Sequence, residues 1–383
     1  MKIPLAWLQL RKEKIRLLIA LAGISFADIL MFMQLGFRDA LFDSAVTPHK
    51  GLNGDIFLLS PKTNSIIAPR GFARRRLYQA LALEGVENAY PVYINFAPWK
   101  DPVKRTTRNI MIIAINPIDP ILTFPGVPEN QQALKQEDTV LFDELSRSEF
   151  GPIASQFKAG KTVFSEVSAH KVKVAGLFKL GTSFGADGNI ITSDLTYAKI
   201  FPSLDPTLIS IGVIKLKPGA NPNQVIASIR EKLNMGDVKI FSRQEFIDYE
   251  IFYWQSSTAI GFIFTLGTVM GFIVGIVIVY QILYTDIANH LPEYATLKAM
   301  GYGNLYLLNI VFQEALILAC LGYLPGLGLT LLLYSNTAVA TGLPIMMTLA
   351  RAISVLVLTI VMCCLSGSIA ANRLRSADPA DIF

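Results

Sequence analysis

Four long apolar stretches set the pattern of this 383-residue chain. They cover residues 15–37, 258–284, 305–334 and 352–372. A helix of roughly 20 apolar residues crosses the ~30 Å hydrocarbon core of a bilayer. The pattern therefore predicts four membrane-spanning helices, with one large polar region, residues 38–257, between the first and the second.

The positions of basic residues predict how these spans are oriented. Residues 1–14 form a short amphipathic segment in which Lys2, Arg11, Lys12 and Lys14 outnumber Glu13. Such an excess of positive charge marks the cytoplasmic side of a membrane. A cleaved signal peptide is the alternative, but the apolar run is long for one and no A-x-A cleavage site follows it.

Four spans return the C-terminus, residues 373–383, to the cytoplasm, and Arg373 and Arg375 agree with that side. Residues 38–257 are then periplasmic, and residues 286–303 are cytoplasmic. Residues 335–351 form a short periplasmic loop. Arg351 lies on the less usual side and is the one objection to this topology.

Residues 38–257 alternate strand-like and helix-like stretches, which predicts an α+β domain with helices packed on a sheet. The strand-like stretches are residues 54–60, 109–116, 208–216 and 238–241, and the helix-like ones are 73–83 and 221–234. The loop-rich middle, about residues 117–205, is interpreted as a second subdomain inserted into the first.

Two helical stalks are predicted to join this domain to the membrane. Ser242 and Glu245 fit a capping box, and no Gly or Pro interrupts residues 243–260. A continuous helix over residues 243–284 would be about 63 Å long, so residues 243–257 would stand outside the bilayer as a stalk. The first span keeps helical spacing to residue 46. Two stalks would form a lever; ordinary helix ends that fray are the alternative.

Composition and motifs exclude several kinds of chemistry. Only 16% of the residues are charged, against about 25% in soluble domains, and the net charge of +5 gathers at the membrane edges, so nucleic-acid binding is not indicated. Residues 159–164, "AGKTVF", lack the first glycine of a P-loop because position 155 is Ser. No H-E-x-x-H or G-x-S-x-G motif occurs. No catalytic, cofactor-binding or metal-binding residue is predicted, and Cys320, Cys363 and Cys364 are interpreted as buried small hydrophobes.

Two acidic residues fall inside predicted spans, where charge is costly. Asp28 and Glu314 are expected to face the helix bundle or a partner subunit, in a structural role rather than a proton relay. Glycines at four-residue spacing permit close helix contact, and they are Gly267, Gly271, Gly275, Gly322 and Gly326. Packing within one chain and packing in a dimer explain them equally well. Pro325 predicts a kink in the third span.

The cytoplasmic segment "HLPEYATLKAMGYGN", residues 290–304, is predicted to contain a helix of about nine residues. Pro292 and Glu293 suit its start, and Lys298 and Gly301 suit its end. Tyr294, Leu297 and Met300 fall on one face with Gly301. Either lipid headgroups or a cytoplasmic partner could meet that face.

The order of these features resembles a known family. One span, a large outer domain, three further spans and "EYATLKAMG" between the second and third resemble the FtsX-like permease family of ABC transporters, of the MacB type. The segment is similar to the coupling segment of that family, E-x-x-x-x-[KR]-x-x-G. "RLRSADPADIF" (373–383) resembles the closing segment of the family. Three stretches, "LNGDIFLLSPKTNSI", "LFKLGTSFGADGNIITSD" and "LPEYATLKAMGYGN", resemble DevC-type permeases of cyanobacterial glycolipid exporters.

This resemblance implies a multi-pass inner-membrane permease that is not itself an enzyme. ATP and magnesium would bind to a separate ABC ATPase subunit, DevA-like, because the MacB-type fusion of an ATPase is not seen before the short "MKIPLAWLQLRKEK". Tyr294, Leu297 and Met300 would contact that ATPase, and Glu293 and Lys298 would orient the helix. Further implied partners are a second copy of the chain, membrane lipids, a DevB-like membrane-fusion adaptor and, through it, a TolC-like channel.

The implied function is to carry ATP-driven motion through the coupling helix and the stalks to the periplasmic domain, which would expel a lipid-like substrate, a glycolipid by resemblance. An FtsX-like regulator that transports nothing is the main alternative. A membrane-anchored sensor or adhesion protein is another, but the coupling helix argues against it.

Overall fold

The computed structural model describes residues 14–233 and 236–372. The predicted N-terminal segment up to residue 13 and the C-terminal segment 373–383 lie outside the described residues. Contacts divide the chain into two compact units. One, called here the helical unit, holds the described residues up to 40 together with 259–340 and those from 345 onward. The other, called the α+β domain, holds residues 41–258 and 341–344.

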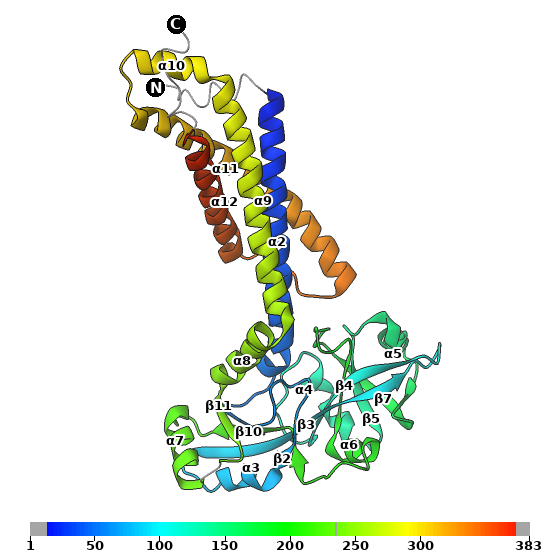
Figure 1. Ribbon diagram of the computed structural model, residues 1–383. Coiled ribbons are helices and arrows are strands. Elements are labelled where there is room, and N and C mark those ends of the chain that lie inside the picture. The colour runs from blue at the N-terminus through cyan, green and yellow to red at the C-terminus, as the bar shows by residue number, and fades with distance from the viewer. Residues whose placement is uncertain (1–13, 234–235, 373–383) are drawn as a thin grey trace. The chain divides into compact units, whose positions relative to one another are not determined.

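Four helices in the described part of the chain are long and apolar enough to cross a membrane. They are α2 (Lys14–Lys50), α9 (Ala259–Asn289), α11 (Asn304–Thr341) and α12 (Leu349–Ala370). The short α10 (Leu291–Ala299) connects α9 to α11 (Figure 1). The prediction of four spans, with the large domain between the first and the second, is therefore confirmed. α11 begins one residue before the predicted span and continues through Pro325.

The sheet of the α+β domain has nine strands in the order β11-β1-β10-β3-β4-β8-β5-β7-β6. The strands are β1 (Ile56–Leu59), β3 (Val86–Lys100), β4 (Thr107–Ile115), β5 (Thr139–Asp143), β6 (Phe164–Val167), β7 (His170–Phe178), β8 (Asn189–Ser193), β10 (Ile211–Leu216) and β11 (Lys239–Ser242). β2 (Phe72–Ala73) and β9 (Leu208–Ile209) form a separate antiparallel pair. β4 pairs with β8 in parallel, as β5 does with β7, while the other ladders of the large sheet are antiparallel.

Helices connect these strands. They are α3 (Arg74–Ala80), α4 (Val127–Asn130), α5 (Ile153–Lys158), α6 (Asp194–Ile200), α7 (Pro222–Leu233) and α8 (Arg243–Phe252), with short 3₁₀ turns at Gln131–Lys135 and Ser148–Phe150. The predicted α+β class is therefore confirmed.

Alternating side chains of the strands build two hydrophobic clusters. In β1, Ile56 and Leu58 join one cluster and Phe57 and Leu59 join the other, as the two-residue period of a strand requires. Residues 139–143 contribute to both clusters as well. The strands of residues 117–205 thus belong to the same nine-stranded sheet and the same two hydrophobic clusters as the rest of the domain.

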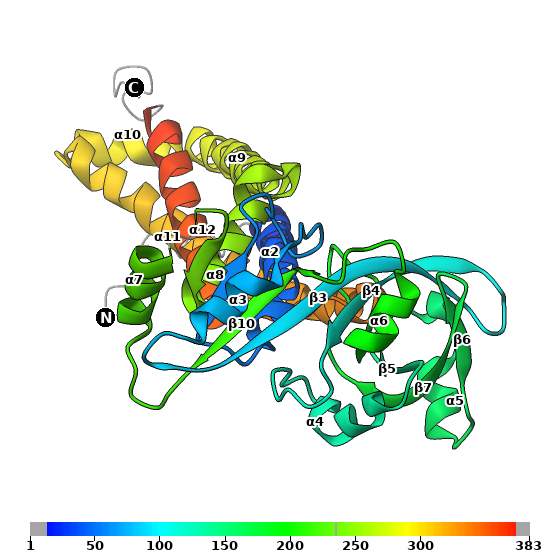
Figure 2. The same cartoon turned by 90° about the horizontal axis from the view of Figure 1, so that it is seen from below.

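The longest strand, β3, was not predicted from the sequence. It contains Pro91 and Pro98, and proline is rare inside central strands because it lacks an N–H donor. β3 nevertheless pairs with β10 along its first half and with β4 along its second half. Figure 2 shows it as a long ribbon crossing the α+β domain.

The predicted continuous helix over residues 243–284 is wrong. α8 passes into one π-helical stretch, Tyr253–Ser257, and Thr258 is extended, with φ −120° and ψ 156°, before α9 begins. The Thr258 hydroxyl donates a 2.7 Å hydrogen bond to the Trp254 carbonyl, a local bond of the kind that competes with regular helix. The capping box at the start of α8 is confirmed: the Ser242 hydroxyl accepts from the Glu245 amide, and the Glu245 carboxylate accepts from the Ser242 amide.

The first stalk is continuous, as predicted. α2 is a single helix of 37 residues, about 56 Å at 1.5 Å per residue. Its last ten residues, 41–50, belong to the α+β domain and the earlier ones to the helical unit. One uninterrupted helix therefore runs through both units.

A buried carboxylate holds the glycine-rich loop that follows β7. Asp143 is fully buried at the end of β5. It accepts hydrogen bonds from the amides of Leu180 and Gly181 at 3.1 and 2.9 Å, and from the Asn189 side chain at 2.8 Å. Burial raises the pKa of Asp143, and these hydrogen bonds oppose that rise. The loop "LGTSFGADGN" thus has a structural explanation.

We expect Asp143→Ala to destabilise the α+β domain by about 3 kcal/mol, because it leaves several buried donors unsatisfied. Urea unfolding of the detergent-solubilised chain, followed by tyrosine and tryptophan fluorescence, measures the change. Asp43→Ala removes an aspartate whose side chain is 66% exposed, so its effect should stay within about 0.5 kcal/mol. Equal stability of the two variants would contradict the assigned role of Asp143.

Candidate coupling site

α10 is defined by its ends, much as the sequence predicts. Pro292 lies in its first turn, where the missing N–H costs nothing, and Glu293 is also in that turn. At the other end the Gly301 amide donates to the Lys298 carbonyl at 3.0 Å, and the Tyr302 amide donates to the Leu297 carbonyl at 3.1 Å. Gly301 has φ +90°. These two bonds form a Schellman motif, which requires a residue of positive φ at this position.

The buried face of α10 anchors it in the helical unit. Tyr294 is 1% exposed and Ala295 is fully buried. The Tyr294 side chain is part of the hydrophobic core of this unit. Leu297 is partly buried against the same core. Tyr294 was predicted to meet a partner, but its side chain faces the interior of its own chain. Tyr294 is therefore an anchor of α10 in this structure.

The exposed surface is formed by other residues of the same segment. Met300 is 63% exposed, and Pro292 and Glu293 are also exposed, while Lys298 is partly buried. The exposed surface continues beyond Gly301 through Tyr302, Leu305 and Tyr306. These last three residues were not predicted to belong to this surface, although the spacing of Tyr302 and Tyr306, four positions apart, is visible in the sequence. Their ring centroids lie 4.6 Å apart.

A polar cluster lies where α9 ends and α10 begins. His290 precedes α10, and its Nδ1 lies 3.0 Å from the Asp286 carbonyl and 3.6 Å from the Asp286 carboxylate. Glu314, on α11, is 1% exposed and lies close enough to the Asp286 carboxylate for the two groups to interact. Glu314 thus faces the helix bundle, and its contact ties α11 to the segment that leads into α10.

Asp28, the other acidic residue in a predicted span, is also directed into the bundle. It is fully buried on α2, and its Oδ1 accepts a 2.6 Å hydrogen bond from the Thr359 hydroxyl on α12. A buried acidic group with a hydrogen-bond partner links two spans within one chain. A structural role accounts for this contact.

The predicted glycines allow close helix packing within the chain. A Cβ added to Gly322 would lie 2.6 Å from the Ile24 side chain of α2, and one added to Gly326 would lie 3.3 Å from the backbone of Ser25. Gly267, Gly271 and Gly275 of α9 likewise face side chains of α2, and Gly275 also faces Met362 of α12. These intrachain contacts account for the four-residue spacing without a second copy.

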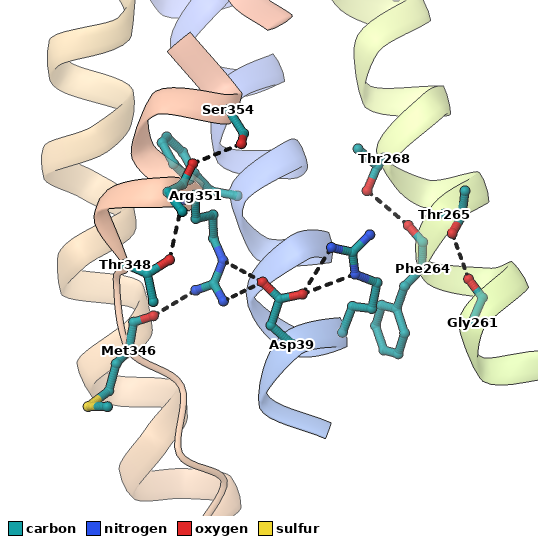
Figure 3. Close-up of polar contacts among 12 residues, drawn as sticks. Asp39, Gly261, Phe264, Thr265, Thr268, Met346, Thr348, Arg351 and Ser354 are labelled. Atoms are coloured by element: carbon teal, nitrogen blue, oxygen red, sulfur yellow. Dashed lines mark hydrogen bonds and ion pairs between the residues drawn. The ribbon is translucent and has the colours of Figure 1, made fainter. Parts of the chain in front are cut away.

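An ion pair explains Arg351, whose position was the objection to the predicted topology. Arg351 is 6% exposed near the start of α12. Its Nη2 and Nε donate to Oδ2 of Asp39 on α2 at 2.7 and 3.2 Å, and its Nη1 donates to the Met346 carbonyl at 2.6 Å. Figure 3 shows Arg351 directed at Asp39 with Met346 and Thr348 beside it. The charge is therefore paired and does not face lipid.

A second buried pair joins the two helices that lead into the α+β domain. His49, in the last turn of α2, and Glu250, on α8, are each 1% exposed, and Nε2 of His49 lies 3.4 Å from the Glu250 carboxylate. Glu250 also accepts from the Ile66 amide at 3.1 Å, the Trp254 indole at 2.9 Å and the Ser65 hydroxyl. The contact between His49 and Glu250 was not predicted, because nothing along the chain shows that positions 201 apart would meet.

The arrangement defines a class of protein: a multi-pass membrane protein with one large α+β domain after its first helix and a short anchored helix between its second and third. Within this class, residues 265–379 match the FtsX-like permease C-terminal family. The match spans most of α9 and all of α10, α11 and α12. This part of the chain is similar to the C-terminal region of FtsX-like permeases.

Comparison with curated proteins finds no match. Among solved structures, the periplasmic region of MacB from Actinobacillus actinomycetemcomitans aligns over 51% of this chain and 92% of its own, with 13% identity and a TM-score of 0.35. The extracellular domain of the noncanonic ABC-type transporter YknZ from Gram-positive bacteria aligns over 49% and 99%, with 10% identity and a TM-score of 0.33. A domain of a putative permease from Porphyromonas gingivalis aligns over 51% and 93%, with 14% identity and a TM-score of 0.32.

We expect Arg351→Met to destabilise the helical unit by about 2 kcal/mol, because Asp39 loses its charged hydrogen bonds. Arg38→Met is the matched control: Arg38 contacts the same carboxylate but is 34% exposed, and exposed pairs contribute at most about 1 kcal/mol. Thermal unfolding in an uncharged detergent compares the two. A larger loss for Arg38→Met would contradict the assignment.

Proposed function

We propose that this chain is the permease subunit of an ABC-type exporter and that a separate ATPase docks on α10. The observation that carries the proposal is the position of α10 inside the FtsX-like region, residues 265–379. α10 is capped at its end, anchored by Tyr294 and exposed on its other side. A helix held in this way can be pushed by a partner without separating from its own chain.

The contacts of α10 suggest how displacement would spread. Tyr294 joins α10 to the core that α2, α9, α11 and α12 share, and Glu314 ties α11 to Asp286. α2 then continues without interruption into the α+β domain. There, His49 and Glu250 join α2 to α8. In this mechanism ATP and magnesium act on the partner, and this chain supplies only docking and mechanical coupling.

The finer assignments rest on the resemblance of three sequence stretches to DevC-type permeases. We extend the proposal to an inner-membrane permease whose α+β domain is periplasmic, which works as a homodimer with a DevA-like ATPase. Its cargo would be lipid-like, a glycolipid by that resemblance, and would leave through a DevB-like adaptor and a TolC-like channel. The positive charge of the N-terminal segment supports the orientation.

We expect Met300→Asp to weaken binding of a candidate ABC ATPase subunit at least about tenfold, because it places a charge at an apolar contact. Co-purification and permease-stimulated ATP hydrolysis measure the effect. Met346→Asp is the matched control, since Met346 is 70% exposed and lies outside α10. Tyr294→Asp is unsuitable as a docking test, because it places a charge in the core.

Unchanged co-purification and unchanged turnover for Met300→Asp, together with Tyr302→Asp, would reject docking at this surface. If the ATPase binds through α10 but no lipid leaves the membrane in a reconstituted system with the adaptor, the regulator hypothesis would replace export. The two measurements thus separate docking from transport.

Glu250→Gln is expected to leave ATPase binding intact but to weaken coupling within the α+β domain. The amide keeps the shape of the side chain but loses the charge that faces His49 and orients the Ser65 and Trp254 donors. Hydrogen–deuterium exchange of α8, with and without ATP, should show a nucleotide-dependent difference in the native complex that is reduced in the variant. Asp248→Asn, exposed on the same helix, is the control; identical behaviour of both variants would contradict the role of Glu250.

A further inference from the structure

A cavity of about 300 Å³ lies in the α+β domain. None of the residues that line it belongs to the coupling site. It is lined by the start of α3, the middle of β3, the first turns of α6 and the segment that leads through β9. Figure 2 shows β3 running from beside α3 toward α6. Cavities of this size, formed where several elements meet, are the usual sites of small ligands.

One wall of the cavity presents a guanidinium without a carboxylate partner. Arg74 is partly buried, and its Nε and Nη2 donate to the Tyr78 hydroxyl at 2.9 and 2.6 Å. Among the residues that the structure describes, no Asp or Glu oxygen lies within 4.0 Å of it. Tyr78 is a neutral acceptor, so the charge of Arg74 is not neutralised by direct contact. A phosphate or carboxylate would match the planar fork of this side chain.

Another part of the lining presents a carboxylate beside aromatic rings. Asp194, in the first turn of α6, accepts from the Leu195 amide at 3.0 Å, and no Lys or Arg nitrogen in the described ranges lies within 4.0 Å of it. The rings of Tyr93 and Tyr197 are 5.4 Å apart, and those of Tyr197 and Phe201 are 4.8 Å apart. Aromatic faces together with a carboxylate favour a cationic ammonium group.

The pKa of Asp119 supports the assignment of an ammonium group beside Asp194. Burial, and after it the negative charge of Asp194, raise the pKa of Asp119 to about 6, although Arg74 opposes the rise. An ammonium group beside Asp194 would offset the negative charge that contributes to this rise.

Apolar side chains line the rest of the cavity. Ile94 and Ile209 are buried, whereas Leu195, Leu204 and Leu208 are 65%, 44% and 42% exposed. Exposed leucines beside a cavity gain free energy when a ligand covers them, about 25 cal/mol for each Å² of apolar surface removed from water. A ligand with an apolar portion would use this surface.

We infer that the cavity binds a zwitterionic amphiphile, with a phosphate or carboxylate at Arg74, an ammonium group at Asp194 and its aromatic neighbours, and an apolar portion against the leucines. A purely anionic ligand would meet the carboxylates of Asp194 and Asp205, since the lining holds one arginine and two aspartates. A purely cationic ligand would meet Arg74. The head group of an ethanolamine phospholipid and a short apolar peptide share the required chemistry.

Isothermal titration calorimetry on the full chain in an uncharged maltoside detergent tests this inference without any ATPase, so its outcome is independent of docking at α10. The probes are glycerophosphoethanolamine, the dipeptide Leu-Leu, inorganic phosphate and ethylamine. At least one zwitterion should bind at least about tenfold more tightly than either singly charged probe, because it engages both charged groups. Tighter binding of glycerophosphoethanolamine identifies a phospholipid head group, and tighter binding of Leu-Leu identifies a peptide.

Arg74→Gln and Asp194→Asn should each weaken the zwitterion about tenfold or more, since each removes one charged contact. Arg75→Gln, an exposed neighbour outside the lining, should bind as the native chain does. Leu204→Asn tests the apolar contact without changing charge and should weaken Leu-Leu. No saturable binding of any probe, phosphate binding as tightly as both zwitterions, or equal affinity of all the variants would overturn the inference.

Discussion

Close contact of glycines in α9 and α11 with the side of α2 is the interaction on which the helical unit depends. In lipid, helices gain little from burying apolar surface against one another, so tight packing and hydrogen bonds decide their association. Gly275 lets α9 approach Ala27, and Gly322 and Gly326 let α11 approach the turn around Ser25. The Ser25 hydroxyl then donates a 2.9 Å hydrogen bond to the Gly322 carbonyl. Any larger side chain at these glycines would move α2 away from both neighbours.

Polar groups buried among these apolar side chains restrict the positions in which the helices can pack. An unpaired polar group there is costly, whereas a paired one accepts only a narrow range of positions. Asp28 with Thr359, and Asp39 with Arg351, connect α2 to α12 at two levels. Glu314 of α11 interacts with Asp286 near the end of α9, and this contact connects those two helices. These pairs fix the rotation of each helix about its own axis, which apolar contacts alone leave less defined.

Local chemistry made part of this structure predictable. The capping box at Ser242 and the glycine that ends α10 depend on residues within six positions, so the sequence predicted both helix ends. Contacts over long separations were not predictable: Arg351 and Asp39 are 312 positions apart. The side of α10 that faces the core was also missed, because a nine-residue helix with apolar residues on more than one face does not show which side is buried. The helix breaks at Thr258 without the Gly or Pro that usually marks such a break.

The interruption at Thr258 makes the backbone between α8 and α9 unlike that of the continuous α2. α2 carries its hydrogen-bonded backbone from one unit into the other, so twisting or bending it breaks helical bonds one after another. Tyr253–Ser257 and Thr258 hold a π-helical turn and one extended residue, where backbone rotation disrupts fewer helical bonds. A change of backbone dihedral angles at Thr258 therefore disrupts fewer helical hydrogen bonds than the same change within α2.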